Sequence, residues 1–303
     1  MKRQIISSGV IALFLILSAC KEPFKEKGSP KYLSEVNSWH KKRIENLKKE
    51  NGWLNLVGLF WLKDGENSFG SAESNDIVFP KGKCPDVLGK FILKDSVVTI
   101  IANDEIKILC DKQSITKKEL TIDSQGEPSV LEYGSLRWFV IKRGNKYGIR
   151  LRDLETDLVK NFGGVKTFPI NSDWKLEALF KYYKPAKTIA VPNVLGAIEE
   201  EKSPGALYFN KDNIEYKLDV LDGGDSYFIV FADETSGDET YGGGRFVSVP
   251  KADSTGKTYI DFNKAYNPPC AFTKYATCPM PPKQNYLKIK IYAGEKNYGH
   301  DNH

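Results

Sequence analysis

Side chains of an apolar face recur near the N-terminus at steps of three and four positions, the spacing of one side of an α-helix. The stripe, which includes one histidine, consists of Leu33, Val36, His40, Ile44 and Leu47. It begins just after Pro30 and is followed by Asn51-Gly52, where Gly52 is free to adopt the left-handed conformation that closes a helix. The pattern therefore predicts one amphipathic helix between Pro30 and Asn51.

After this helix the pattern changes to short runs of β-branched and aromatic residues separated by Gly, Asn, Asp and Pro, which is typical of strands. One short helix is predicted at 153–162. The predicted strands are 54–62, 76–79, 89–93, 97–102, 136–142, 147–152, 176–182, 189–191, 216–220, 227–232, 246–249, 259–262 and 287–292. The fold class is therefore mainly β, with β-sandwich or barrel-like sheets after one N-terminal α-helix.

Residues 62–99 are similar to the opening strands of forkhead-associated β-sandwiches. Those domains read phosphothreonine through an arginine after the first glycine and a serine before the next strand. Here Ser71 follows Gly70, and neither serine nor histidine stands at the matching place before Gly89. The resemblance implies an architecture for the first half and no phosphate recognition.

Three further segments, 51–62 (NGWLNLVGLFWL), 233–246 (DETSGDETYGGGRF) and the proline-rich 261–296, carry a second resemblance. Together they resemble the bacterial family known as domain of unknown function 1684, over residues 39–296. No activity is established for that family, so the resemblance implies membership and no chemistry. We expect a family domain at 32–296 and a C-terminal tail at 297–303. The length fits one large β domain or two small ones with a boundary near 133.

The first residues have the features of a secretory signal. Lys2 and Arg3 precede an apolar run at 9–17 that is too short to span a bilayer. The run ends in Leu-Ser-Ala before Cys20, which resembles a bacterial lipobox. This predicts a signal peptide at 1–19, lipidation of Cys20 (palmitate), a polar tether at 20–31, and a location on the bacterial cell envelope, membrane-anchored and facing outside the cytoplasm. The alternatives are an uncleaved anchor, or an ordinary signal in which Cys20 is incidental.

The charge balance argues against nucleic acid as a partner. The chain has 44 basic and 39 acidic side chains, and cleavage of the signal removes two of the basic ones. No basic block remains, and an exported protein meets little nucleic acid.

Four cysteines remain after Cys20, an even number that suits an exported protein. The simplest pairing joins neighbours in sequence, Cys84 with Cys110 and Cys270 with Cys278. Zinc is the competing interpretation for the second pair, but the eight-residue spacing does not suit a zinc knuckle. Two unpaired, buried thiols are the alternative for the first pair.

Several kinds of catalytic chemistry lack their residues in this sequence. The chain has three histidines, of which His300 and His303 are near the end and His40 lies on the helix stripe. A Ser-His-Asp or Cys-His nucleophile system, or a histidine metal site, is therefore disfavoured. Neither a phosphate-binding loop nor a dinucleotide fingerprint is present, so we expect no metal and no cofactor. In the segment GIRLRD we expect Arg150 and Asp153 to form an ion pair, with a ligand role as the alternative.

Two polar loops that follow predicted strands are the candidate ligand site. If the strands are neighbours, both loops lie at one end of a sheet and face one pocket. The candidates are Asp233, Ser236, Tyr241, Arg245, Asp261, Asn263, Tyr266 and Asn267. Arg245 is the natural anchor for an anion or hydroxyl because its planar fork pairs bidentately. The alternatives are a polar hairpin, a structural plug of amides and prolines, and a structural salt bridge of Arg245.

These patterns predict a membrane-anchored lipoprotein that binds a polar small molecule or glycan. One alternative is a carbohydrate-active hydrolase or lyase, in which Asp233, Asp261 or Glu295 serves as acid and base and Tyr241 or Tyr266 assists. A purely structural envelope lipoprotein is the other.

Overall fold

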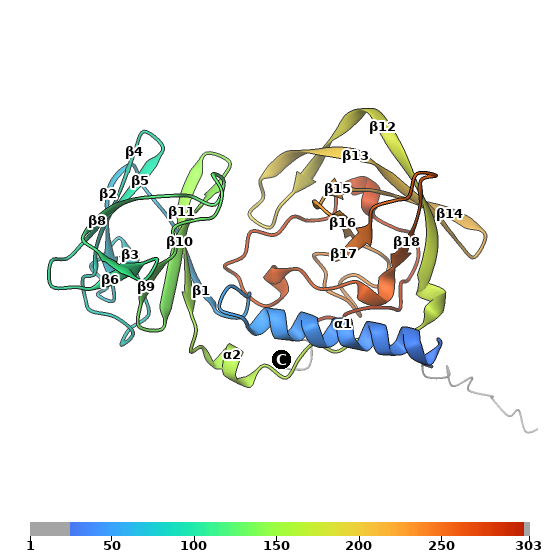
Figure 1. Cartoon of the computed structure of the whole chain (residues 1–303), viewed down its shortest axis with the longest axis horizontal. Helices are drawn as coiled ribbons and strands as arrows, with labels where there is room; N and C mark the ends of the chain where they lie inside the picture. Colours follow the sequence, from blue (N-terminus) through green and yellow to red (C-terminus); the bar gives the residue numbers. More distant parts are fainter. Residues whose placement is uncertain (1–24, 300–303) are drawn as a thin grey trace, which may run out of the picture.

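The computed structural model describes residues 25–299. The predicted signal peptide 1–19, the lipidation site Cys20 and the histidines at 300 and 303 lie outside the described residues. Within the described part, the chain forms two β units beside one long helix (Figure 1). No helix among the described residues is long and apolar enough to cross a membrane.

The helix α1 (Pro30–Lys48) confirms the predicted amphipathic stripe. Ser29 caps its first turn, since the Ser29 side chain accepts a hydrogen bond from the backbone N–H of Tyr32 at 3.2 Å. Val36 and Leu47 are fully buried. The helix ends at Lys48 with Lys49 as an extended C-cap, and the N–H of Gly52 donates to the carbonyl of Lys49. The left-handed cap expected at Gly52 is not formed, because Gly52 has no positive φ.

The first unit consists of two sheets over one core. The six-stranded sheet has the order β1-β11-β10-β9-β6-β7 and the five-stranded sheet the order β3-β2-β4-β5-β8. Trp138, Ile149 and Leu151 lie in the core between them. The strands are β1 (Leu56–Trp61), β2 (Gly65–Gly70), β3 (Ile77–Val78), β4 (Gly89–Lys94), β5 (Val97–Ala102), β6 (Ile108–Cys110), β7 (Gln113–Ile115), β8 (Lys117–Leu120), β9 (Leu131–Tyr133), β10 (Leu136–Arg143) and β11 (Lys146–Asp153).

The second unit is built from a four-stranded sheet, β14-β13-β12-β18, and a three-stranded sheet, β15-β16-β17, which curve around a second core (Figure 1). The short helix α2 (Asp157–Asn161) lies in the connection between the units and confirms the prediction at 153–162. The strands are β12 (Lys175–Pro192), β13 (Ile198–Lys211), β14 (Ile214–Asp219), β15 (Leu221–Asp222), β16 (Ser226–Phe231), β17 (Arg245–Pro250) and β18 (Lys257–Asp261), and the 3₁₀ helices are η1 (Ser172–Trp174), η2 (Phe262–Lys264), η3 (Pro269–Ala271) and η4 (Lys283–Asn285).

The mainly β fold class is confirmed, and one predicted strand is wrong. Residues 287–292 alternate as a strand would, and Leu287 and Ile291 are buried in the second core, but the segment pairs with no strand of the described residues. Its backbone groups bond to side chains and a loop instead: Arg245 donates to the carbonyl of Ile291 at 3.1 Å. The turn at Gly134, near the predicted boundary at 133, joins β9 to β10 within one sheet, and the second unit begins only after β11.

Helix α1 is held on the second unit by polar contacts. Arg43 forms an ion pair with Glu295 at 3.2 Å and donates to the carbonyl of Asn267 at 2.8 Å. Tyr32 donates from its hydroxyl to Asp261 at 2.9 Å. His40 lies in the same interface, and burial lowers its pKa. The charges of Arg43 and Lys264 lower the pKa further. The backbone of Asn263 and the carboxylate of Asp261 oppose the shift.

This interface predicts a pH-dependent stability. Because folding lowers the pKa of His40, the unfolded chain binds a proton at higher pH than the folded chain does, and acidification through the ordinary histidine range destabilises the fold. The free energy of unfolding should therefore fall between pH 7.5 and 5.5, by at most about 1.4 kcal/mol per pH unit from this residue. In His40→Gln this contribution is absent. Urea denaturation of both proteins at the two pH values measures it, and equal losses in the variant and the parent would contradict it.

Candidate functional site

The first predicted loop uses its charged residues within the fold. Arg245 and Asp233 form an ion pair at 2.8 Å, and neither side chain is exposed. Arg245 also donates to the carbonyls of Ala293, at 2.5 Å, and Ile291. One oxygen of Asp233 accepts hydrogen bonds from the N–H and hydroxyl of Thr235. Burial lowers the pKa of Arg245, and Asp233 counteracts the shift. Because Arg245 lies in β17 and bonds the carbonyls of Ile291 and Ala293, the pair fastens the C-terminal segment to β17.

The second predicted loop lies beneath α1. Asn263 donates to the hydroxyl of Tyr32 and to the carbonyl of Asn171, and accepts from the N–H of Asn171. Asn267 donates its N–H to the carboxylate of Glu295 at 2.7 Å. Burial raises the pKa of Glu295, which the ion pair with Arg43 opposes.

The two loops meet at Glu295. Arg245 approaches the carbonyl of Glu295 at 3.4 Å, while Asn267 holds its carboxylate. Ser236 accepts a hydrogen bond from the N–H of Asp233, and Tyr241 lies half-buried, where burial and the Cys270 thiol raise its pKa. None of the eight predicted residues lines the principal clefts of residues 25–299. Residues 291–295 and α1 contact both loops where they approach each other.

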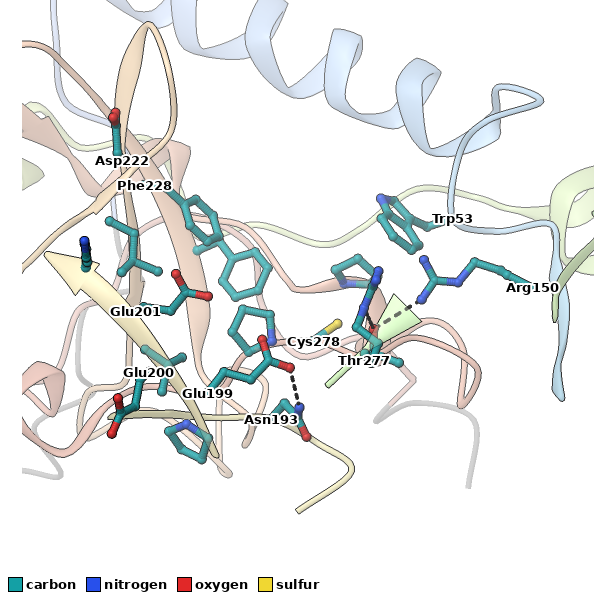
Figure 2. Close-up of a pocket in the computed structure, with 18 residues that line it drawn as sticks. Trp53, Arg150, Asn193, Glu199, Glu200, Glu201, Asp222, Phe228, Thr277 and Cys278 are labelled. Carbon is teal, nitrogen blue, oxygen red and sulfur yellow. Dashed lines mark hydrogen bonds between the residues drawn. The ribbon is translucent and has the colours of Figure 1, made fainter. Parts of the chain in front are cut away.

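A cleft of about 690 Å³ lies elsewhere, between the two β units (Figure 2). This volume is within the range of small-molecule sites. The first unit contributes Arg143 and Arg150, and Trp53 comes from the turn after α1. The second unit contributes the strand ends of β12 and β13, together with Phe228, Phe246 and the segment 277–279.

Arg150 is the unusual residue of this cleft. It is 4% exposed, and its Nη2 donates to the hydroxyl of Thr277 at 3.2 Å. Among the described residues its Nε, like that of Arg245, is buried without a hydrogen-bond partner. Within residues 25–299 no carboxylate pairs with it, whereas its neighbour Arg143 bonds Asp123 at 2.7 Å and also donates to Thr277. Burial, with Arg143 and Arg152 nearby, lowers the pKa of Arg150 to about 10, so the guanidinium stays charged at neutral pH.

The alternation of β11 explains why Arg150 points into the cleft. Successive side chains of a strand point to opposite faces. Tyr147, Ile149 and Leu151 lie in the first core. Arg150 is therefore on the other face, which the second unit covers, and its guanidinium carbon lies 5.6 Å from the ring centre of Trp53.

The expected ion pair between Arg150 and Asp153 is not formed. Asp153 instead pairs with Lys83 at 3.2 Å. Positions three apart in a strand lie on opposite faces, so the two side chains could not meet. Arginine at alternate positions of an otherwise apolar strand is the sequence signal that sets Arg150 apart from a solvent-exposed residue.

The wall opposite Arg150 contains three glutamates and one lysine, residues 199–202. Glu199 and Glu201 of β13 pair in register with Val191 and Ile189 of β12, both of which are buried. Directly opposed residues of antiparallel strands share a face, so the two glutamates lie on the face turned toward the cleft (Figure 2). Glu199 accepts a hydrogen bond from the side chain of Asn193 at 3.1 Å. Within the described residues neither glutamate forms an ion pair.

The two predicted disulfides are not formed. Cys84, Cys110, Cys270 and Cys278 are free thiols in the structure. Cys84 and Cys110 each pack against the first core, and burial raises the pKa of Cys84 to about 11. Cys278 lines the cleft, and its sulfur accepts a hydrogen bond from the N–H of Cys270 at 3.1 Å.

The buried ion pair yields a stability prediction. Arg245→Met leaves the Asp233 carboxylate buried without a counter-charge and frees the carbonyls at 291 and 293, so we expect a loss of about 3–5 kcal/mol. Lys251→Met breaks the exposed pair with Asp222, at 2.6 Å, and should cost at most about 1 kcal/mol. Urea denaturation of both variants measures the difference. Similar small losses in the two variants would show that Arg245 does not fasten the C-terminal segment.

Comparisons with known proteins place the second half of the chain in a family. Residues 160–296 match the family model described as "Protein of unknown function (DUF1684)". A comparison with curated proteins finds no match. Among solved structures, the chain is similar to the solution NMR structure of an uncharacterized protein from gene locus rrnAC0354 of Haloarcula marismortui. That likeness has 25% identity and a TM-score of 0.38, and covers 45% of this chain and 78% of the other.

The family match includes the segments 233–246 and 261–296 on which the sequence-based resemblance partly rests, and begins after the first β unit. It thus confirms the family prediction for the second half. Residues 160–296 of this chain belong to the DUF1684 family.

Proposed function

We propose that this protein is a membrane-anchored lipoprotein of the bacterial cell envelope that binds a polar small molecule or glycan in the cleft between its two β units. The observation that carries the proposal is Arg150, a charged side chain that is 4% exposed and lines the cleft, and whose buried Nε has no partner in the described part of the chain. Buried charges are normally paired. A ligand with an acceptor oxygen at this position supplies the missing partner.

The surroundings of Arg150 suit a small polar ligand with a flat or apolar part. The Trp53 ring, Phe228 and Phe246 line the same cleft, and Thr277 adds a hydroxyl already shared by Arg143 and Arg150. An apolar lining with a few fixed polar groups is the usual composition of ligand sites. Sugar rings and small acids both have this mixed character.

The three carboxylates predicted for the hydrolase do not line this cleft. Glycoside hydrolysis needs two carboxylates that converge on the substrate. Asp233 is paired with Arg245, and Asp261 and Glu295 lie under α1. We therefore propose binding without assigned catalysis, and a purely structural lipoprotein becomes one outcome of the binding test.

The binding proposal predicts a loss of ligand in Arg150→Gln. Full-length protein in detergent is screened by thermal shift against sugars, sugar acids, organic acids and amino acids. A compound that raises Tm in the parent should bind about 10- to 100-fold more weakly to Arg150→Gln, because a hydrogen bond to a charged group contributes about 1.5–3 kcal/mol. Lys146→Gln, an exposed change on the same strand, is the matched control and should bind as the parent does.

Two outcomes would contradict the binding proposal. An unchanged shift in Arg150→Gln would place the ligand outside the cleft. If no compound stabilises the parent, the structural role is favoured instead.

The anchoring proposal is tested at Cys20. Cys20→Ala should abolish incorporation of a tagged fatty acid in the producing cells, because the thiol is the predicted attachment point. The parent and a Cys84→Ala control should both be labelled. Label that persists in Cys20→Ala would exclude this residue as the lipidation site.

A further inference from the structure

We infer that the ligand of the cleft is a small zwitterion, an amino acid or short peptide, whose carboxylate bonds Arg150 and whose ammonium group lies against Glu199 and Glu201. This inference rests on the proposed function and names the ligand class of the same cleft. It comes from the charges on the two facing walls, which have opposite sign and do not neutralise each other.

The basic wall requires an anion. Arg150 is 4% exposed and its Nε has no partner within the described residues. Within residues 25–299 its side chain donates one hydrogen bond, to the neutral hydroxyl of Thr277. Since Arg143 is neutralised by Asp123, the basic wall retains one uncompensated positive charge. A ligand carboxylate accepts from a guanidinium fork better than a neutral oxygen does.

The acidic wall suits a cation, although Lys202 also lines it. Glu199 and Glu201 lie two positions apart on the inward face of β13, so two carboxylates share one side of the cleft. Glu199 is oriented by the Asn193 amide, which is neutral and leaves the carboxylate charge in place. Like charges on one strand face repel, and an ammonium group between them relieves the repulsion.

The charges are held apart by the two units. Arg150 is fixed to the first unit by β11, and the glutamates are fixed to the second unit by β13. Among the residues described, no ion pair joins Arg143 or Arg150 to β13. A simple anion leaves the glutamates unpaired and a simple cation leaves Arg150 unpaired. A zwitterion satisfies both walls, and Trp53 and Phe228 provide an apolar surface for its side chain.

Isothermal titration of full-length protein in detergent tests the inference. The probes are phenylalanine, the dipeptide Ala-Phe and the tripeptide Ala-Ala-Phe, because the span between the two charges differs among them. The best binder is then compared with its N-acetyl form, its C-terminal amide and a neutral disaccharide. We expect each blocked form to bind about 10- to 100-fold more weakly than the zwitterion.

Variants assign each charge to its wall. In Arg150→Gln the free acid and the amide should bind alike, and in Glu199→Gln/Glu201→Gln the free amine and the N-acetyl form should bind alike. Glu215→Gln, an exposed change on β14, is the control and should keep both preferences.

The outcomes separate this inference from the proposed function. If the N-acetyl form binds as well as the zwitterion, or if the disaccharide binds and Arg150→Gln weakens it, the cleft remains the site but the zwitterion is excluded. If Arg150→Gln leaves every measured affinity unchanged, or none of the probes binds, the inference is overturned. Binding of other compounds in the wider thermal-shift screen then decides the proposed function.

Discussion

Strand β11 is buried on both faces, and the arrangement of the molecule depends on this constraint. Every residue from Tyr147 to Asp153 is buried. One face of the strand completes the first core with Ile149 and Leu151, and the other carries Arg150 and Arg152 toward the second unit and α1. A strand of this kind usually has apolar residues on both faces. Here one face is basic, so the junction of the two units must accommodate buried charge.

The molecule accommodates its buried arginines in different ways. Arg245 has a carboxylate partner and carbonyl acceptors, and Arg152 donates to the carbonyl of Gly52 and to Asn55. Arg150 alone among these three has neither an ion-pair partner nor a backbone acceptor in the described part of the chain. Burying a charge without compensation costs several kcal/mol. The cleft beside Arg150 gives an anion access to that charge, so a bound ligand offsets the free-energy cost of burying it.

The sequence predicts the local structure better than the site. The periodicity of 33–47 and the turn residues after it define α1 closely, and most short strands follow from their own side chains. The strand β13 is not predicted, because the run of glutamates at 199–201 does not look like a strand; its long hairpin with β12 stabilises it. The alternation at 287–292 predicts a strand that is absent, because Arg245 and Asp233 supply the hydrogen bonds that a neighbouring strand would.

The same two residues explain why the first predicted loop does not line the cleft between the units. A glycine-rich loop with an aspartate and an arginine has the composition of a ligand site. It also has the composition of a buried ion pair that holds another segment in place, an internal clamp. Only tertiary structure distinguishes the two, because the segment that the clamp holds lies 46 positions or more along the chain. For Arg150 the error is the reverse, because its sequence suggested a structural role and the structure places it in a cleft. Its local sequence suggested an ion pair with Asp153, and the alternation of the strand excludes it.

The central claim is that a ligand in the cleft between the units accepts a hydrogen bond from the Nε of Arg150. A crystal structure of the protein with a compound that stabilises it tests this claim most directly. The account predicts a ligand oxygen within hydrogen-bond distance of the Arg150 Nε, the atom that no described group of the protein reaches. A ligand bound elsewhere, with the Nε of Arg150 bonded to a protein carboxylate or carbonyl, would contradict it.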